Sequence, residues 1–188
     1  MPIRIFIDQG HNPQNPNAGA EGNGLREQDL VYYIGAELAA LLNADPDFEA
    51  RLSRNSPTEV LGTSTATSLS ARVRAANEWP ADYFISIHAN ASDITTASGS
   101  EAFVYSMSSE GYPFALDILE GLTDATGLED RGVFARPTLY VLRATKMPAT
   151  LIEVGFITSA ADAALMNENP RLIAEGMYNG ILTYFGLN

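Results

Sequence analysis

Two histidines and a few carboxylates are the side chains of this sequence that could do chemistry. His11 and His88 are its only histidines. Residues 3–7 and 83–87 are runs typical of buried strands; His11 follows the first run after a short turn, and His88 comes directly after the second. The carboxyl ends of strands form the edge where open α/β sheets bind ligands. Two imidazoles at that edge indicate a metal site, and Glu27 could supply a third ligand, which is the donor set of many catalytic zinc sites.

A plainer interpretation exists for each of these residues. A lone histidine is more often a hydrogen-bonded structural residue than a ligand. Glu27 falls in the first turn of a predicted helix, where the helix dipole alone favours a carboxylate. Asp8 either orients a ligand imidazole from behind or ends its strand. The spacing of these residues leaves both interpretations open.

Glu153 is more informative, because it interrupts the apolar run of residues 149–156. Burying an ionised carboxylate is costly unless it has a charged partner. A metal centre would be such a partner, and the alternative is a buried pair with Arg143 or an edge position. Arg131 and Arg143 could each bind a substrate carboxylate through a bidentate pair, although either one alone is more simply a solvated surface arginine.

Strand and helix patterns alternate along the chain. Strands are predicted at residues 3–7, 48–54, 83–88, 101–106, 139–143 and 149–156. Helices are predicted at residues 25–42, 69–78 and 113–126, in a short segment around Asp162, and after Asn169-Pro170. The Asn-, Pro- and Gly-rich residues 12–24 are expected to form a functional loop without helix or strand. This alternation predicts an α/β domain with a mostly parallel sheet and helices on both faces.

Composition narrows the class of protein. A chain of 188 residues with 46 % hydrophobic residues is expected to fold as a single domain, residues 1–188. With 11 Lys+Arg against 23 Asp+Glu, no nucleic acid or membrane partner is expected. The absence of cysteine restricts any zinc site to His and carboxylate ligands. The N-terminus shows no export signal, and no apolar run is long enough to span a bilayer.

Five separated motifs resemble, in order and approximate spacing, the zinc-dependent N-acetylmuramoyl-L-alanine amidases of the type-3 family. They are IFIDQGH (5–11), GLRE (24–27), SIHANA (86–91), RGV (131–133) and PATLIEVGFI (148–157). The resemblance implies a six-stranded mixed sheet, one zinc ion held by His11, Glu27 and His88, and Glu153 as the catalytic carboxylate. The chain departs from the family pattern at Asn12-Pro13, Asp130 and Ser159, none of which is an implied ligand.

By this resemblance the protein cleaves the amide between N-acetylmuramic acid and L-alanine in peptidoglycan, with Arg131, Arg143 and Asn90 contacting the substrate. We expect a monomeric catalytic domain without a separate cell-wall-binding domain. It would act at the bacterial cell wall, as a secreted enzyme whose signal is absent from this chain or as a phage-type lysin. A zinc peptidase cutting within the stem peptide, or a catalytically silent peptidoglycan-binding module, are the alternatives.

Overall fold

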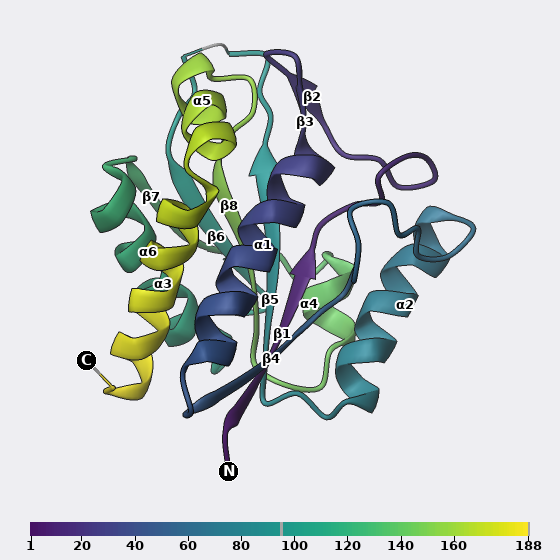
Figure 1. Cartoon of the computed structure of the whole chain (residues 1–188), viewed down its shortest axis with the longest axis vertical. Coiled ribbons are helices and arrows are strands. Elements are labelled where there is room, and N and C mark those ends of the chain that lie inside the picture. Colours follow the sequence, from purple (N-terminus) through teal and green to yellow (C-terminus); the bar gives the residue numbers. More distant parts are fainter. Residues whose placement is uncertain (95, 188) are drawn as a thin grey trace.

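A computed structural model describes residues 1–94 and 96–187 of the chain (Figure 1). The strands are β1 (Ile3–Gln9), β2 (Glu21–Gly22), β3 (Leu25–Arg26), β4 (Phe48–Leu52), β5 (Tyr83–Asn90), β6 (Ser100–Val104), β7 (Asp130–Ala135) and β8 (Ala149–Phe156). The helices are α1 (Glu27–Ala44), α2 (Thr65–Glu78), α3 (Gly111–Thr126), α4 (Tyr140–Ala144), α5 (Ala160–Glu168) and α6 (Pro170–Phe185). The predicted α/β fold is confirmed.

Six strands form one sheet in the order β4-β1-β5-β8-β6-β7, and β2 and β3 form a small separate hairpin. Every neighbouring pair in the large sheet is parallel except β6 and β8, which are antiparallel. The carboxyl ends of β1, β5 and β8 therefore meet at one edge. The register places His88 on β5 beside Glu153 on β8, and Glu153 beside Glu101 on β6.

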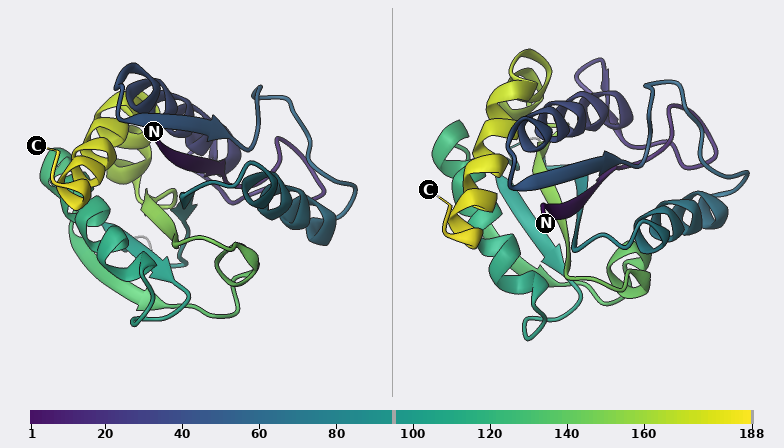
Figure 2. Two further views of the ribbon diagram at one scale, coloured as in Figure 1. Left: turned by 90° about the horizontal axis from the view of Figure 1, so that it is seen from below. Right: turned by 60° about the horizontal axis from the view of Figure 1, so that its bottom comes forward.

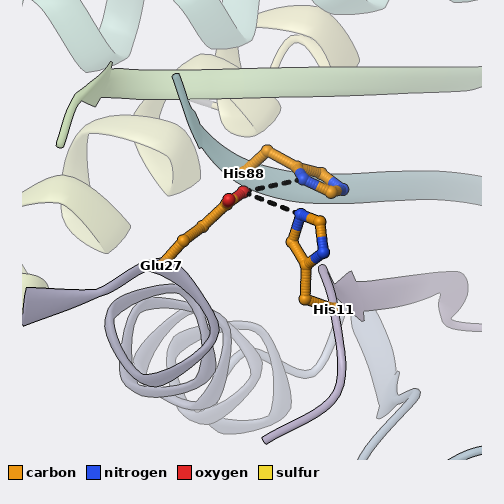
Figure 3. A group of neighbouring side chains, drawn as sticks. All are labelled: His11, Glu27 and His88. Carbon is orange, nitrogen blue, oxygen red and sulfur yellow. Dashed lines mark hydrogen bonds and ion pairs between the residues drawn. The ribbon is translucent and has the colours of Figure 1, made fainter. Parts of the chain in front are cut away.

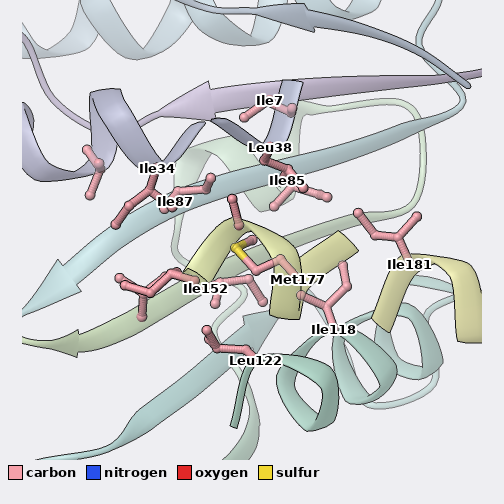
Figure 4. Packing of buried hydrophobic residues seen from close by; sticks show 14 of the residues in the cluster. Ile7, Ile34, Leu38, Ile85, Ile87, Ile118, Leu122, Ile152, Met177 and Ile181 are labelled. Carbon is pink, nitrogen blue, oxygen red and sulfur yellow. The ribbon is translucent and has the colours of Figure 1, made fainter. Parts of the chain in front are cut away.

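Helices cover the two faces of the sheet unequally. On one face α1, α3 and α6 enclose the larger apolar core, which contains Ile34, Ile85, Ile118, Ile152 and Met177 (Figure 4). On the other face α2 and α4 enclose a smaller core around Phe84 and Leu151 (Figure 2). Alternate residues of each strand enter the two cores, so His88 and Glu153, in step with Leu151, lie on the α2/α4 face.

The sixth strand differs from the sequence prediction. Helix α4 (Tyr140–Ala144) occupies the segment where a strand was predicted at residues 139–143, and β7 is the sixth strand of the sheet instead. A short apolar run such as 139–142 does not distinguish a strand from a buried helical turn, and both edges of β8 are already paired with β5 and β6. The strand β7 was missed because Asp130, Arg131 and Gly132 interrupt its apolar pattern.

Other boundaries shift for local reasons. Helix α2 begins at Thr65 instead of residue 69, because Ser64 and Thr67 form a reciprocal capping box. Helix α1 begins at Glu27, and the two residues before it pair with Glu21–Gly22, so the predicted loop 12–24 contains a short strand. Among the described residues, no helix combines the length and apolar character that a bilayer span requires.

Candidate metal centre

His11, Glu27 and His88 converge at the carboxyl edge of the sheet (Figure 3). One carboxylate oxygen, Glu27 Oε1, lies 2.9 Å from His88 Nδ1 and 3.1 Å from His11 Nε2. The three residues offer ligand atoms that all lie within 4.8 Å of one another. Three sequence segments far apart in the chain thus bring two imidazoles and one carboxylate to a common point, which is a donor set that suits a zinc ion.

Local backbone features position these side chains. Gly10 lies against the imidazole of His88, and a Cβ atom there would come within 2.5 Å of the ring. Gly19 likewise lies against the side chain of Glu27, because a Cβ atom added at Gly19 would lie 2.7 Å from Glu27 Oε2. His11 itself adopts φ 64, a left-handed conformation that costs a non-glycine residue about 1 kcal/mol or more. The glycines and the strained turn together pack the loop tightly against the cluster.

Glu27 is held as a carboxylate. Its side chain is buried, and it accepts hydrogen bonds from the backbone N–H groups of Ala20 (2.9 Å) and Ala89 (3.1 Å). Burial opposes its ionisation, but the hydrogen bonds and charges of His11 and His88 outweigh burial and hold the pKa of Glu27 well below its ordinary value. An anionic oxygen between two imidazoles would attract a cation to this point.

A buried ion pair supports the turn that carries His11. Arg72 on α2 donates to Asp8 Oδ1 (2.6 Å), to the Gln9 carbonyl (2.6 Å) and to the His11 carbonyl. Asp8 also accepts a 2.8 Å hydrogen bond from Ser86 Oγ. Burial opposes the ionisation of Asp8, but Arg72 outweighs it and lowers the pKa of Asp8 below its ordinary value. Asp8 and Arg72 thus support the backbone around His11. From the sequence, Asp8 was expected to orient an imidazole or to end its strand, and Arg72 was not predicted as the partner of Asp8.

Glu153 pairs in register with His88 and has no hydrogen-bond partner within residues 1–94 and 96–187. Its Oε2 atom is buried without a hydrogen bond among the described residues. Burial raises the pKa of Glu153 to about 8, helped by the negative charges of Glu27 and Glu101. No ion pair with Arg143 forms in the described part of the chain. A partly buried carboxylate with a strongly perturbed pKa beside a possible metal site is a candidate for proton transfer.

The predicted substrate residues lie in two places. Asn90 Nδ2 donates to Glu101 Oε1 (2.7 Å), and Arg131 Nε lies 3.5 Å from Glu101 Oε2, so both adjoin Glu153 through Glu101. Arg143 lies on α4 with its guanidinium 5.8 Å from the centre of the Tyr140 ring. The sequence interpretation missed Glu101, although its place two residues before Phe103 in a predicted strand marked a carboxylate on an otherwise apolar face.

An α/β sheet whose carboxyl edge gathers His, Glu and His ligand atoms, beside a partly buried carboxylate without a hydrogen-bond partner among the described residues, has the make-up of a metal-dependent hydrolase. The comparison with known families agrees with this class. The chain matches the N-acetylmuramoyl-L-alanine amidase family over residues 5–183 and belongs to it.

Individual relatives show the same likeness. The amidase CwlM of Bacillus licheniformis is 36 % identical over 99 % of this chain and 70 % of its own length. The amidase LytC of Bacillus subtilis is 35 % identical over 96 % of this chain, which spans only 35 % of LytC. In the crystal structure of an N-acetylmuramoyl-L-alanine amidase from Clostridium difficile 630, the shared fold has a TM-score of 0.87 at 30 % identity and covers 98 % of this chain and 97 % of that one.

Proposed function

We propose that this chain is a zinc-dependent N-acetylmuramoyl-L-alanine amidase that holds one zinc ion through His11, Glu27 and His88. The observation that carries the proposal is the convergence of His11 Nε2 and His88 Nδ1 on Glu27 Oε1, at 3.1 and 2.9 Å, beside Glu153 in register on the next strand. A bound zinc ion supplies a Lewis acid for the scissile carbonyl and for the attacking water. The substrate is the amide between N-acetylmuramic acid and L-alanine.

Glu153 moves the proton in this proposal. As a carboxylate it accepts a proton from the attacking water and delivers it to the leaving nitrogen of L-alanine, the two roles of a general base and acid. Its buried Oε2 atom has no partner among the described residues and is therefore available for this transfer. Glu101 stays engaged with Asn90 and Arg131, so one carboxylate of the adjacent pair is committed to structure and the other is free to react.

Substrate contacts are proposed for Asn90, Arg131 and Arg143. Asn90 and Arg131 adjoin Glu153 through Glu101, and Arg143 lies on α4 at the same face of the sheet. We also propose that the protein acts on the bacterial cell wall, since its family is that of the N-acetylmuramoyl-L-alanine amidases, and that it does so as a monomer.

The test is incubation of the zinc-loaded protein with purified peptidoglycan, followed by mass spectrometry of the soluble products. Peptides that begin with a free L-alanine amino group, together with a metal content of one zinc per chain, are expected. Shortened stem peptides that remain attached to sugar would instead show that the protein is a peptidase that cuts within the stem. Bound zinc without any product would favour a peptidoglycan-binding module.

Two variants assign the roles. Glu153→Ala should retain zinc and lose turnover, whereas His88→Ala should lose both. Glu168→Gln removes an exposed carboxylate on α5 and serves as the control that keeps both. Full turnover by Glu153→Ala would show that Glu153 has no role in the mechanism, and it would leave the proposed metal site unaffected.

A further inference from the structure

Positive charge is concentrated in one segment of a strongly acidic chain. The net charge is −12, yet residues 131–152 contain Arg131, Arg136, Arg143 and Lys146 and not one Asp or Glu. This segment comprises most of β7, the helix α4 and the first residues of β8. The segment directly precedes Glu153 in the sequence, and its members differ in how near they lie to the proposed reaction centre.

The strand register gives the position of the segment relative to Glu153. Leu151, two residues before Glu153, pairs with Phe103 on β6, and Phe103 pairs with Phe134 on β7. Two residues along a strand and one strand spacing place Phe103 roughly 8 Å from Glu153. Phe134 is 45 % exposed, so the sheet face at β7 is open to solvent at this position, whereas Phe103 belongs to the smaller core.

Arg136 lies over this open face. Its guanidinium carbon is 5.1 Å from the centre of the Phe103 ring, and the side chain is exposed. Stacking on a ring holds a guanidinium in place and leaves its N–H edge free to donate. Arg136 takes part in none of the ion pairs of residues 1–94 and 96–187.

Arg131, which lies on β7 itself, offers a contrast to Arg136. It approaches Glu101 at 3.5 Å, donates to the Ser98 carbonyl at 3.2 Å and stacks over Phe156 at 5.1 Å. Its charge already balances Glu101, the carboxylate beside Glu153. Arg131 is therefore already paired with a carboxylate, whereas Arg136 has no ion-pair partner among the described residues.

We propose that Arg136 binds a free carboxylate of the stem peptide and selects acidic stems over amidated ones. This inference rests on the proposed function for the orientation of the substrate. In peptidoglycan the second stem residue is a glutamate joined through its side chain, which leaves its α-carboxylate free or amidated. That group lies about two residue lengths, roughly 7 Å, from the scissile carbonyl, a span comparable to the roughly 8 Å between Glu153 and Phe103, over whose ring Arg136 stacks.

The first experiment measures binding of two free stem peptides to the zinc-loaded protein by NMR titration. The peptides are L-Ala-γ-D-Glu-L-Lys and the analogue in which only the glutamate α-carboxylate is a carboxamide. The parent protein should bind the carboxylate form about tenfold more tightly, the effect expected for a charge-assisted hydrogen bond. Arg136→Met, which keeps the length over Phe103, should abolish the preference, and Arg136→Lys should restore part of it.

The control is Arg74→Met, which removes an exposed arginine from α2 and should keep the parent preference. A parent without a preference, or an Arg136→Met variant that retains it, overturns the inference. So does an equal loss of affinity for both peptides, because that outcome means a structural role for Arg136.

Turnover of the two matching muramyl tripeptides separates this inference from the proposed function. Selective peptide binding without amide hydrolysis would reject the amidase and leave Arg136 as a carboxylate-binding residue. Hydrolysis of both substrates at equal kcat/KM, with no preference in binding, would support the amidase and reject the role of Arg136.

Discussion

Asp8, which is buried, and Glu153, which is partly buried, are carboxylates on the same face of one sheet with opposite surroundings. Asp8 has Arg72 and Ser86 as partners at 2.6 and 2.8 Å, and its pKa lies below the ordinary value. Glu153 has a buried oxygen without a partner among the described residues, and its pKa is raised to about 8. Both are strand residues close to the same edge.

The difference shows how the fold separates support from chemistry. A fully partnered buried charge stabilises one arrangement and is costly to disturb, because removing its partner leaves an uncompensated charge. An unpartnered buried carboxylate destabilises the protein and persists where function uses it. Asp8 therefore belongs to the framework of the His11 turn, and Glu153 is proposed to react.

The largest contrast is expected in turnover. Glu153→Gln should lower kcat on peptidoglycan by about 10²–10⁴-fold, the usual contribution of a general acid or base, without lowering the midpoint of thermal unfolding. The measurement is product release from purified peptidoglycan by the zinc-loaded variant. A loss below tenfold would place the proton transfer on another residue.

Disrupting the Asp8 side of the comparison should instead change stability. Arg72→Met leaves Asp8 buried and unpaired and frees the carbonyls that Arg72 holds, so the free energy of unfolding should fall by about 3–5 kcal/mol. Urea denaturation measures this loss. Arg74→Met, two residues further along α2 and exposed, should change it by less than about 0.5 kcal/mol, and an equal effect of both variants would show that the Asp8–Arg72 pair is unimportant.

The pH dependence of stability should reveal Glu153 in the metal-free protein. Its folded pKa of about 8 lies above its ordinary value of 4.5, so the folded state binds more protons between these values and stability falls as pH rises through them. Relative to Glu153→Gln, the parent should lose about 2–4 kcal/mol between pH 5 and pH 9, a partial share of the full shift because Glu153 is not completely enclosed. Parallel stability curves for the chelator-treated proteins would contradict the raised pKa.

The smallest effect concerns the hydroxyl that completes the Asp8 network. Ser86→Ala removes the 2.8 Å hydrogen bond to Asp8 Oδ2, while Arg72 stays in place. The free energy of unfolding should fall by about 1–2 kcal/mol. If Ser86→Ala lowered the free energy of unfolding as much as Arg72→Met does, the contributions of the hydroxyl and the guanidinium would be strongly coupled instead of separate.

Most of the fold followed from local sequence patterns. The apolar runs at residues 3–7, 83–88 and 149–156 predicted the central strands β1, β5 and β8, because strands buried on both faces have few polar residues. The segment 139–143 was assigned to the wrong element, since a short apolar run has no periodicity that separates helix from strand. At β7 the charged residues obscured the pattern, and only pairing with β6 makes the segment a strand.

The sequence by itself determined which residues could do chemistry: two histidines after strand patterns, a carboxylate at a helix start, and Glu153 in an apolar run. The tertiary structure decided how they combine. Parallel pairing of β5 and β8 aligns His88 with Glu153, and helix α1 begins where Glu27 reaches both imidazoles. The tertiary structure also pairs Arg72 with Asp8 and Arg131 with Glu101, whereas Arg136 pairs with no acid in the described part of the chain. Such choices depend on distances between segments remote in the chain, which a linear pattern of residue types does not contain.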